Sequence, residues 1–383
     1  MAYKCIRNAN VLLHKNNKYL IEQHDLIIYD GKIEAFDIFV EDAEIIDMKG
    51  KLIVPCFFNM HCHLGESIFR NIQGGYWTIE KYIEYTNHYN CSLSKEQQEK
   101  KWTESAQYSI KEMKKVGILG ICAARCSNIC NEYGFYNMSG YPLMNSIKLN
   151  HFKNKGIDGF VEYCELNRSD QCSVGIFYHS LYMNDRNTLR LANNTLERGA
   201  EFFTVHISED VVTTQKERKM YGKNAIYTLD EYDLLNKNTI LVHCGYTTQD
   251  ELELIAKKGA SISVCPISNQ FLNTKMPNIN MLEELGINWF VSTDGVATGR
   301  DFSLAKQAAE IKKKFCRISY DRLFFNITEG PAQLYNRNGY TGRIEVGVDA
   351  NFLVFNCEET NKNYFFEGLF NGRYNIEACF KSK

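Results

Sequence analysis

The stretch LIVPCFFNMHCH, residues 52–63, joins a run of apolar side chains to two histidines, His61 and His63. In a strand, residues i and i+2 point to the same side, so both imidazoles are expected to leave the end of one buried strand together. Two convergent neutral imidazoles form half of a typical zinc site. The stretch therefore predicts a buried strand that ends at a metal-binding site.

Three later apolar runs also end in a residue able to bind a metal, namely His206, His243 and Asp294. Strand-like runs alternate with helix-like segments through this part of the chain, as in residues 239–242 followed by 250–258. About eight such units over about 280 residues favour a parallel (β/α)8 TIM barrel. The alternative is a doubly wound open sheet, which is disfavoured because no Gly-x-Gly-x-x-Gly loop follows the first strand.

Both ends of the chain have a different pattern, in which short β runs are separated by polar turns. The predicted strands there are residues 9–14, 26–29, 33–36, 342–347 and 351–355. The N-terminal segment cannot bury both of its faces alone, so we expect the two ends to share one small β-sandwich domain. The predicted domains are therefore a composite β domain of residues 1–54 and 340–383, and a barrel of residues 55–339.

The composition is that of an ordinary globular chain, with 44% hydrophobic residues and a net charge of -2. This charge argues against a nucleic acid or a membrane surface as partner, and no apolar run approaches the roughly 18 residues of a membrane span. The 14 cysteines are irregularly spaced, which favours free thiols in a reducing compartment. We expect a cytoplasmic enzyme, with a homodimer as the default assembly.

Functional side chains of parallel barrels come from the C-terminal ends of strands, and six residues follow this rule: His61, His63, His179, His206, His243 and Asp294. One divalent metal held by the group His61, His63, His206 and Asp294 would have nitrogen and oxygen ligands. These suit Zn²⁺, with Fe²⁺ and Mn²⁺ as alternatives, and such a metal lowers the pKa of a bound water to roughly 7. His14, by contrast, has a polar, turn-like context and is expected at the surface.

Hydrolysis at such a site also needs a group that transfers protons. Glu209, three residues after His206, is the predicted proton shuttle, whereas its neighbour Asp210 is expected to face solvent or to cap a helix. His243 could polarise the leaving group, stabilise an oxyanion or orient the water. Catalytic roles are therefore predicted for Glu209 and His243 beside the metal ligands.

Several motifs occur in one order along the chain: residues 55–63 with Asn59-x-His-x-His, VHISE at 205–209, LVH at 241–243, CPISN at 265–269, STDG at 292–295 and GRIEVGVDA at 342–350. Together they resemble the amidohydrolase superfamily, and within it the cytosine deaminase and triazine hydrolase branch, which includes guanine and S-adenosylhomocysteine deaminases. The resemblance covers nearly the whole chain. The predicted fourth strand, residues 173–178, has no lysine, which disfavours a two-metal centre bridged by a carbamylated lysine.

The resemblance implies one catalytic metal on His61, His63, His206 and Asp294, with proton transfer by Glu209 and Asp294. It implies hydrolytic release of ammonia from a small amino-substituted nitrogen heterocycle such as a purine, pyrimidine, pterin or nucleoside. Glu209 would protonate a ring nitrogen as hydroxide adds to the adjacent carbon.

The predicted substrate contacts lie near the expected mouth of the barrel. His179 matches a position at which related deaminases place a substrate-contacting histidine. Arg70 and Trp77 fall in the first βα loop, where Arg70 could bind a ring carbonyl or a carboxylate and Trp77 could stack on a planar ring. Glu66 is a further candidate contact, to an amino group.

Three other functions remain open at this point. One is a hydrolase that opens a cyclic amide, similar to an imidazolonepropionase, and another is a chloro-heterocycle hydrolase. The third is a metal-binding scaffold without activity. Glu209 disfavours the second, because dechlorinating relatives can lack the shuttle acid, and also the third, because a scaffold has no need of one.

Overall fold

The structure is a computed structural model that describes residues 2–144 and 150–381. It divides into two compact units. One comprises Met1–Phe58, Glu112–Gly120 and Ser303–Lys383, and the other comprises Asn59–Lys111 and Ile121–Phe302. The domain boundaries expected from the sequence, at residues 55 and 340, stay a prediction.

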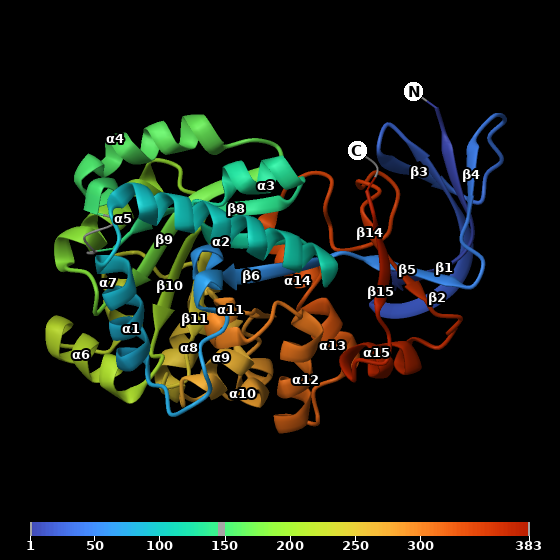
Figure 1. Ribbon diagram of the computed structural model, residues 1–383. Helices are drawn as coiled ribbons and strands as arrows, with labels where there is room; N and C mark the ends of the chain where they lie inside the picture. The colour runs from blue at the N-terminus through green and yellow to red at the C-terminus, as the bar shows by residue number, and fades with distance from the viewer. Residues whose placement is uncertain (1, 145–149, 382–383) are drawn as a thin grey trace. The chain divides into compact units, whose positions relative to one another are not determined.

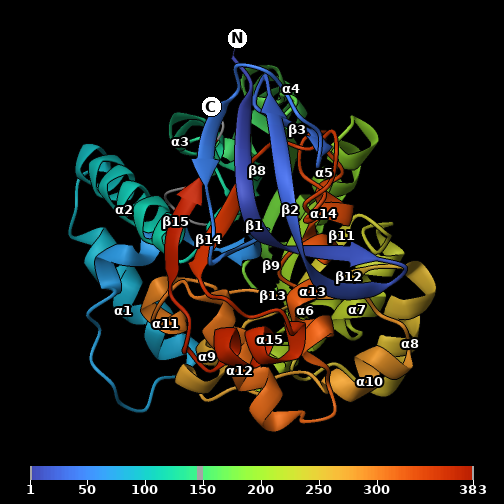
Figure 2. The same ribbon diagram turned by 90° about the vertical axis from the view of Figure 1, so that its right-hand side faces the viewer.

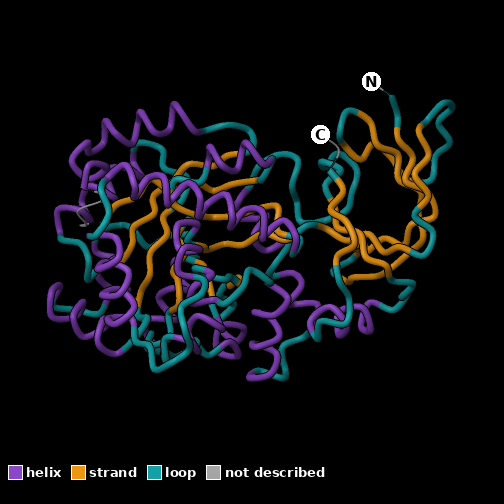
Figure 3. The backbone as a smooth tube through the Cα atoms, viewed as in Figure 1, coloured by secondary structure: helices purple, strands orange, loops and turns teal. Residues whose placement is uncertain are grey.

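Eight strands form one sheet in the order β13-β12-β11-β10-β9-β8-β7-β6. Their bounds are β6 (Phe57–Cys62), β7 (Ile118–Ala124), β8 (Tyr136–Leu143), β9 (Cys172–Ser180), β10 (Phe203–Ile207), β11 (Thr239–His243), β12 (Ser261–Val264) and β13 (Trp289–Val291). Neighbouring strands from β8 to β13 pair in parallel, and a parallel bridge between Cys62 and Asp294 connects the two edges. This nearly closed parallel sheet, flanked by helices in Figures 1 and 3, confirms the predicted barrel.

The barrel strands are apolar because helices cover their outer side. Every residue of β6, β10 and β11 is buried, as expected for parallel strands with both faces covered. The helical segments of this part of the chain are η1 (Leu64–Phe69), α1 (Ile79–Cys91), α2 (Lys95–Lys115), α3 (Ser127–Tyr133), α4 (Asn150–Asn167), α5 (Arg186–Glu197), α6 (Val211–Tyr221), α7 (Ala225–Glu231), α8 (Gln249–Lys258), α9 (Pro266–Phe271), α10 (Ile279–Glu284) and α11 (Val296–Gly299). None of the helices in the described residues is both long enough and apolar enough to cross a membrane.

The second sheet has seven strands, in the order β15-β14-β5-β1-β2-β3 with β4 paired to β1. They are β1 (Lys4–Lys15), β2 (Lys18–Tyr29), β3 (Lys32–Phe36), β4 (Glu44–Asp47), β5 (Lys51–Pro55), β14 (Phe352–Asn356) and β15 (Ile376–Phe380). Figure 2 shows β1 and β2 as a long antiparallel pair. Strands from both ends of the chain share this sheet, as predicted. The helices of the C-terminal part are α12 (Leu304–Lys314), α13 (Tyr320–Phe325), α14 (Glu329–Tyr335) and α15 (Lys362–Phe370).

Some sequence-based expectations were wrong in detail. Residues 342–347 form no strand, because Gly342 and Gly347 have left-handed φ values of 73° and 91°. Strand β8 was not predicted, since Gly140 and Pro142 interrupt its pattern. A Cβ at Gly140 would lie 2.5 Å from Phe177 Cβ, so the glycine permits close packing on β9.

His14, at the end of β1, is a further correction. It was expected at the surface, but its side chain is only 12% exposed, and Nδ1 lies 2.8 Å from Glu329 Oε2. The sequence does not reveal this pairing, because the two residues are 315 positions apart.

Candidate functional site

The four predicted metal ligands lie together in the unit that contains most of the barrel. His61, His63, His206 and Asp294 each offer one ligand atom, and these atoms all lie within 4.8 Å of one another. The Nε2 atoms of the three histidines are 3.0–3.2 Å apart. Asp294 Oδ1 lies 3.4 Å from His61 Nε2 and 3.1 Å from His63 Nε2. The group, which we call the metal-binding group, therefore converges on one point.

The chemistry of this donor set fits a divalent cation. His206 Nδ1 lies 2.6 Å from the backbone carbonyl of His179, which can only accept, so Nδ1 carries the proton and Nε2 presents a lone pair. Two further imidazole nitrogens and a carboxylate oxygen face the same point. One cation can accept all four lone pairs at once, as in a tetrahedral nitrogen and oxygen site.

Asp294 is oriented by two hydroxyl groups. Ser268 Oγ donates to its Oδ2 at 2.6 Å and Thr298 Oγ1 donates to the same atom at 3.0 Å, which leaves Oδ1 facing the histidines. Burial disfavours the charged carboxylate, but His61 and His63 outweigh this effect and hold the pKa of Asp294 well below its usual range. The orienting role of Ser268 was missed from the sequence, although the CPISN motif that contains it was the available signal.

Asn59 connects the first barrel strand to the segment that carries Asp294. Its Nδ2 donates to Thr293 Oγ1 at 2.6 Å, and its Oδ1 accepts from the Thr293 backbone N–H at 3.2 Å. The Asp294 backbone N–H in turn donates to the His61 carbonyl at 3.2 Å. These bonds fix the spacing between the ligands at the two edges of the sheet.

The protonation states of the histidines follow from burial and nearby charge. Burial lowers the pKa of His61 to about 4 and that of His206 well below its usual value, so both are neutral and able to bind a metal. Burial opposes charge on His63 as well, but the carboxylates of Glu66 and Asp294 raise the pKa of His63 to about 9. The surroundings of His63 therefore favour a nearby positive charge, which a bound cation can supply in place of the proton.

Glu209 lies beside this group, only 7% exposed, with Oε1 3.3 Å from His243 Nε2. Burial, followed by the charge of Asp294, raises the pKa of Glu209 well above its usual range. Burial lowers the pKa of His243. The surroundings of Glu209 therefore favour its protonated form next to a neutral imidazole, which is the state that a proton donor requires.

The backbone turns sharply where these side chains leave the barrel strands. Ser208, His243 and Asp294 have left-handed φ values of 47°, 74° and 59°. Asp210 then caps α6 by accepting from the Thr213 backbone N–H at 2.7 Å. Helix capping was one of the two roles predicted for it. Glu209 is thus held between a left-handed turn and a capped helix.

The predicted substrate contacts have different surroundings. The His179 ring centroid lies 4.7 Å from that of His206, and burial lowers the pKa of His179 to about 3. Arg70 donates to the Ser67 carbonyl at 2.8 Å and lies over the Tyr108 ring. Trp77 donates from Nε1 to the Gln73 carbonyl and packs near Phe271. A substrate-binding role stays a prediction for all three.

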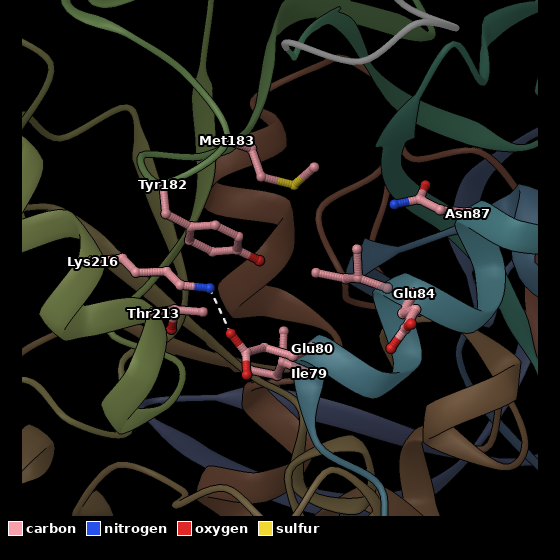
Figure 4. Close-up of a pocket in the computed structure, with 9 residues that line it drawn as sticks. Ile79, Glu80, Glu84, Asn87, Tyr182, Met183, Thr213 and Lys216 are labelled. Atoms are coloured by element: carbon pink, nitrogen blue, oxygen red, sulfur yellow. Dashed lines mark hydrogen bonds and ion pairs between the residues drawn. The ribbon is translucent and has the colours of Figure 1, made fainter.

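A pocket of about 340 Å³ lies between α1 and α6 (Figure 4). Two of the lining segments come directly after candidate site residues. Tyr182 follows β9, which carries His179, and α6 begins at Val211, two residues after Glu209. Lys216 Nζ lies 2.6 Å from Glu80 Oε1, an ion pair that joins the two helices. The lining residues are Ile79, Glu80, Ile83, Glu84, Asn87, Tyr182, Met183, Thr213 and Lys216.

The chain is similar in sequence to known deaminases. A 5-methylthioadenosine/S-adenosylhomocysteine deaminase of Archaeoglobus fulgidus is 25% identical over 334 residues, which cover 82% of this chain and 77% of that protein. A 5'-deoxyadenosine deaminase of Methanosphaera stadtmanae is 24% identical, with 92% and 84% covered.

Solved structures share the fold. A zinc-bound adenosine deaminase of Xanthomonas campestris superposes with a TM-score of 0.86 at 17% identity, covering 100% of this chain and 92% of that chain. The guanine deaminase of E. coli gives 0.84 at 17% identity, with 99% and 98% covered. The sequence model of the amidohydrolase family matches residues 167–373, more than half of the chain. The protein therefore belongs to the amidohydrolase family.

Proposed function

We propose that this protein is a metal-dependent hydrolase that releases ammonia from an amino-substituted nitrogen heterocycle, with purine nucleosides as the first class to test. The observation that carries the proposal is Glu209, a buried acid with a raised pKa beside the metal-binding group. The curated relatives named above support the substrate class, because they are named as deaminases of adenosine derivatives.

The metal-binding group would hold the metal, for which we propose Zn²⁺, since three imidazoles and a carboxylate suit it. When bound, a divalent metal supplies a water molecule whose pKa is lowered to roughly 7. Glu209 donates its proton to the ring nitrogen beside the amino-bearing carbon, which makes that carbon more electrophilic. Asp294 accepts the proton that the water loses as its oxygen bonds to this carbon.

The second half of the reaction breaks the carbon–nitrogen bond. The amino group takes up the proton held by Asp294 and leaves as ammonia, while the new hydroxyl group passes its proton to Glu209 and becomes a ring carbonyl. His243 and His179, both neutral, can hydrogen-bond the developing oxygen or the ring without competing for these protons. The reaction consumes one water and needs no oxidant.

The test is an assay for ammonia with protein whose Zn²⁺ content has been measured. The substrates are adenosine, 5'-deoxyadenosine, 5'-methylthioadenosine, S-adenosylhomocysteine, guanine and cytosine. Mass spectrometry of the product separates deamination from ring opening, because ring opening adds water and retains the nitrogen. Absence of ammonia from all six substrates with fully metal-loaded protein would refute the proposed substrate classes.

A matched pair of variants tests the role of Glu209. We expect Glu209→Gln to keep its metal and lose about 10²–10⁴-fold in kcat, the usual contribution of a positioned proton donor. Glu231→Gln is the control, because this acid lies in α7 and forms an ion pair with Lys223. A Glu209→Gln variant that turns over at the wild-type rate would show that another group moves the proton.

A further inference from the structure

Glu66 is a third acidic side chain at the metal-binding group. It lies in η1, three residues after His63, and its charge acts on His63 and Glu209. It is not a member of the metal-binding group itself. The proposed reaction gives Glu66 no role, since Glu209 and Asp294 carry the protons.

The Glu66 carboxylate is held in place on one side only. Tyr82 in α1 donates its hydroxyl hydrogen to Oε2 at 2.8 Å. Within the described residues Oε1 has no hydrogen-bond partner, and Glu66 is only partly buried. The carboxylate therefore presents one anchored oxygen and one oxygen that can accept a further hydrogen bond.

Gly295 supports this placement independently. A Cβ at this position would lie 1.9 Å from Glu66 Oε2, closer than any real contact. The backbone alone would accept other residues, because φ is -73° and ψ is 146°. The residue that follows Asp294 is thus a glycine that leaves room for the Glu66 carboxylate.

We propose that Glu66, positioned by Tyr82, determines specificity by accepting a hydrogen bond from a substrate N–H or O–H group other than the amino group that leaves. The inference rests on the proposed function for the class of substrate. Burial raises the pKa of Glu66, and the neighbouring His63 opposes this shift. An oxygen of the carboxyl group can accept a hydrogen bond, and such a bond at a buried site discriminates strongly against a ligand that lacks the donor. In a purine nucleoside the donor can be a second amino group on the base or a ribose hydroxyl.

Equilibrium binding of compounds that lack the 6-amino group of adenosine separates these two sources. Purine riboside and 2-aminopurine riboside differ by one amino group on the base. Purine riboside and its 2',3'-dideoxy analogue differ by two hydroxyls on the sugar. For metal-loaded wild-type protein we expect the donor-bearing member of one pair to bind about 10–100-fold more tightly. The pair that shows the difference identifies the donor.

The variants assign that preference to the Glu66 carboxylate. We expect Glu66→Met, which has no strong acceptor, to bring the ratio of the two dissociation constants close to 1. Glu66→Gln should restore part of it, because the amide oxygen accepts without the charge. Tyr82→Phe should lower the ratio less, since it only frees the carboxylate to move. Metal content is measured for each variant so that ratios are compared at equal loading.

Two control variants are matched in chemistry. Glu104→Gln removes an exposed carboxylate of α2, and Tyr85→Phe removes the hydroxyl of a tyrosine in α1 that is 44% exposed. Both should keep the wild-type ratio. A wild-type ratio near 1 for both pairs, or an unchanged ratio in Glu66→Met, would overturn the inference. If adenosine were still deaminated in that case, the proposed function would stand without it. If metal-loaded wild type neither bound these ribosides nor deaminated adenosine, both would fail for purine nucleosides.

Discussion

The two units each contain a group of histidine and carboxylate side chains, and the two groups differ in their hydrogen bonding. In the unit with the seven-stranded sheet, Glu329 is 1% exposed and accepts from His14 Nδ1 at 2.8 Å, Tyr19 Oη at 2.5 Å and Arg343 Nε at 2.6 Å. We call His14, Tyr19, Glu329 and Arg343 the anchor cluster. These three hydrogen bonds each pair the carboxylate with a donor, so the cluster is complete without a ligand.

The metal-binding group has similar residue types, but in it acceptor atoms face one another instead of facing donors. Its Nε2 atoms face one another at 3.0–3.2 Å, and a carboxylate oxygen faces them. One cation at this point can accept these lone pairs together. The balance of donors and acceptors, rather than residue type, therefore distinguishes a structural cluster from a functional one.

The largest effect is expected when a ligand is removed from the metal-binding group. His206→Ala should lower metal affinity by more than the roughly 10–100-fold that follows loss of a group that merely orients a ligand, and activity should be lost with the metal. The measurements are elemental analysis after dialysis against a chelator, and ammonia release. His24→Ala is the control, because His24 pairs with Asp37 at 2.6 Å outside the group. Retention of metal by His206→Ala would show that this group does not bind the metal as proposed.

A substitution in the anchor cluster should change the stability of the protein rather than its metal binding. Glu329→Ala leaves Arg343, His14 and Tyr19 without their acceptor, and the free energy of unfolding should fall by about 3 kcal/mol. Urea unfolding measures this change, and metal content per folded molecule should stay at the wild-type value. Glu22→Ala removes an exposed partner of Lys15 and should cost less than about 1 kcal/mol. Equal losses in both variants would show that the cluster adds nothing beyond a surface pair.

A smaller effect is expected from the hydroxyl group that orients Asp294. Ser268→Ala removes one of two donors to Oδ2, so metal affinity should fall by about 10–100-fold while the fold is retained. Competition with a fluorescent chelator measures the affinity. Ser263→Ala, which removes a buried hydroxyl bonded to Ser292, is the matched control and should leave it unchanged.

The smallest effect is expected for Glu217, a buried acid that belongs neither to the anchor cluster nor to the metal-binding group. Its Oε2 has no hydrogen-bond partner among the described residues, and burial raises the pKa of Glu217 to about 8. Between the unfolded pKa and this value the folded state retains a proton that the unfolded state has lost, so stability falls as pH rises. The free energy of unfolding should drop by about 1 kcal/mol from pH 6 to pH 7, relative to Glu217→Gln. Parallel pH profiles of the two proteins would contradict this.

The sequence predicts the parts of the fold and site that have a local signal. His61 and His63 stand two positions apart after an apolar run, and the other ligands end similar runs, so strand alternation and barrel geometry bring them together. The anchor cluster has no such signal, since its members come from distant segments in no common pattern. Glu66, Tyr82 and Gly295 likewise meet only in the folded chain, because their contacts depend on how η1, α1 and the segment after β13 pack.

The left-handed turns at Ser208, His243 and Asp294 have a consequence for the metal-free protein. Each holds a non-glycine residue in a conformation that costs roughly 1–3 kcal/mol, and the surrounding contacts must maintain it. A cation that ties His206 to Asp294 adds to those contacts, so its release lets this rim of the barrel fluctuate first. Amide hydrogens near these three positions should then exchange fastest when a chelator is present. Metal depletion, rather than heat, would then be the event that exposes the enzyme to proteolysis.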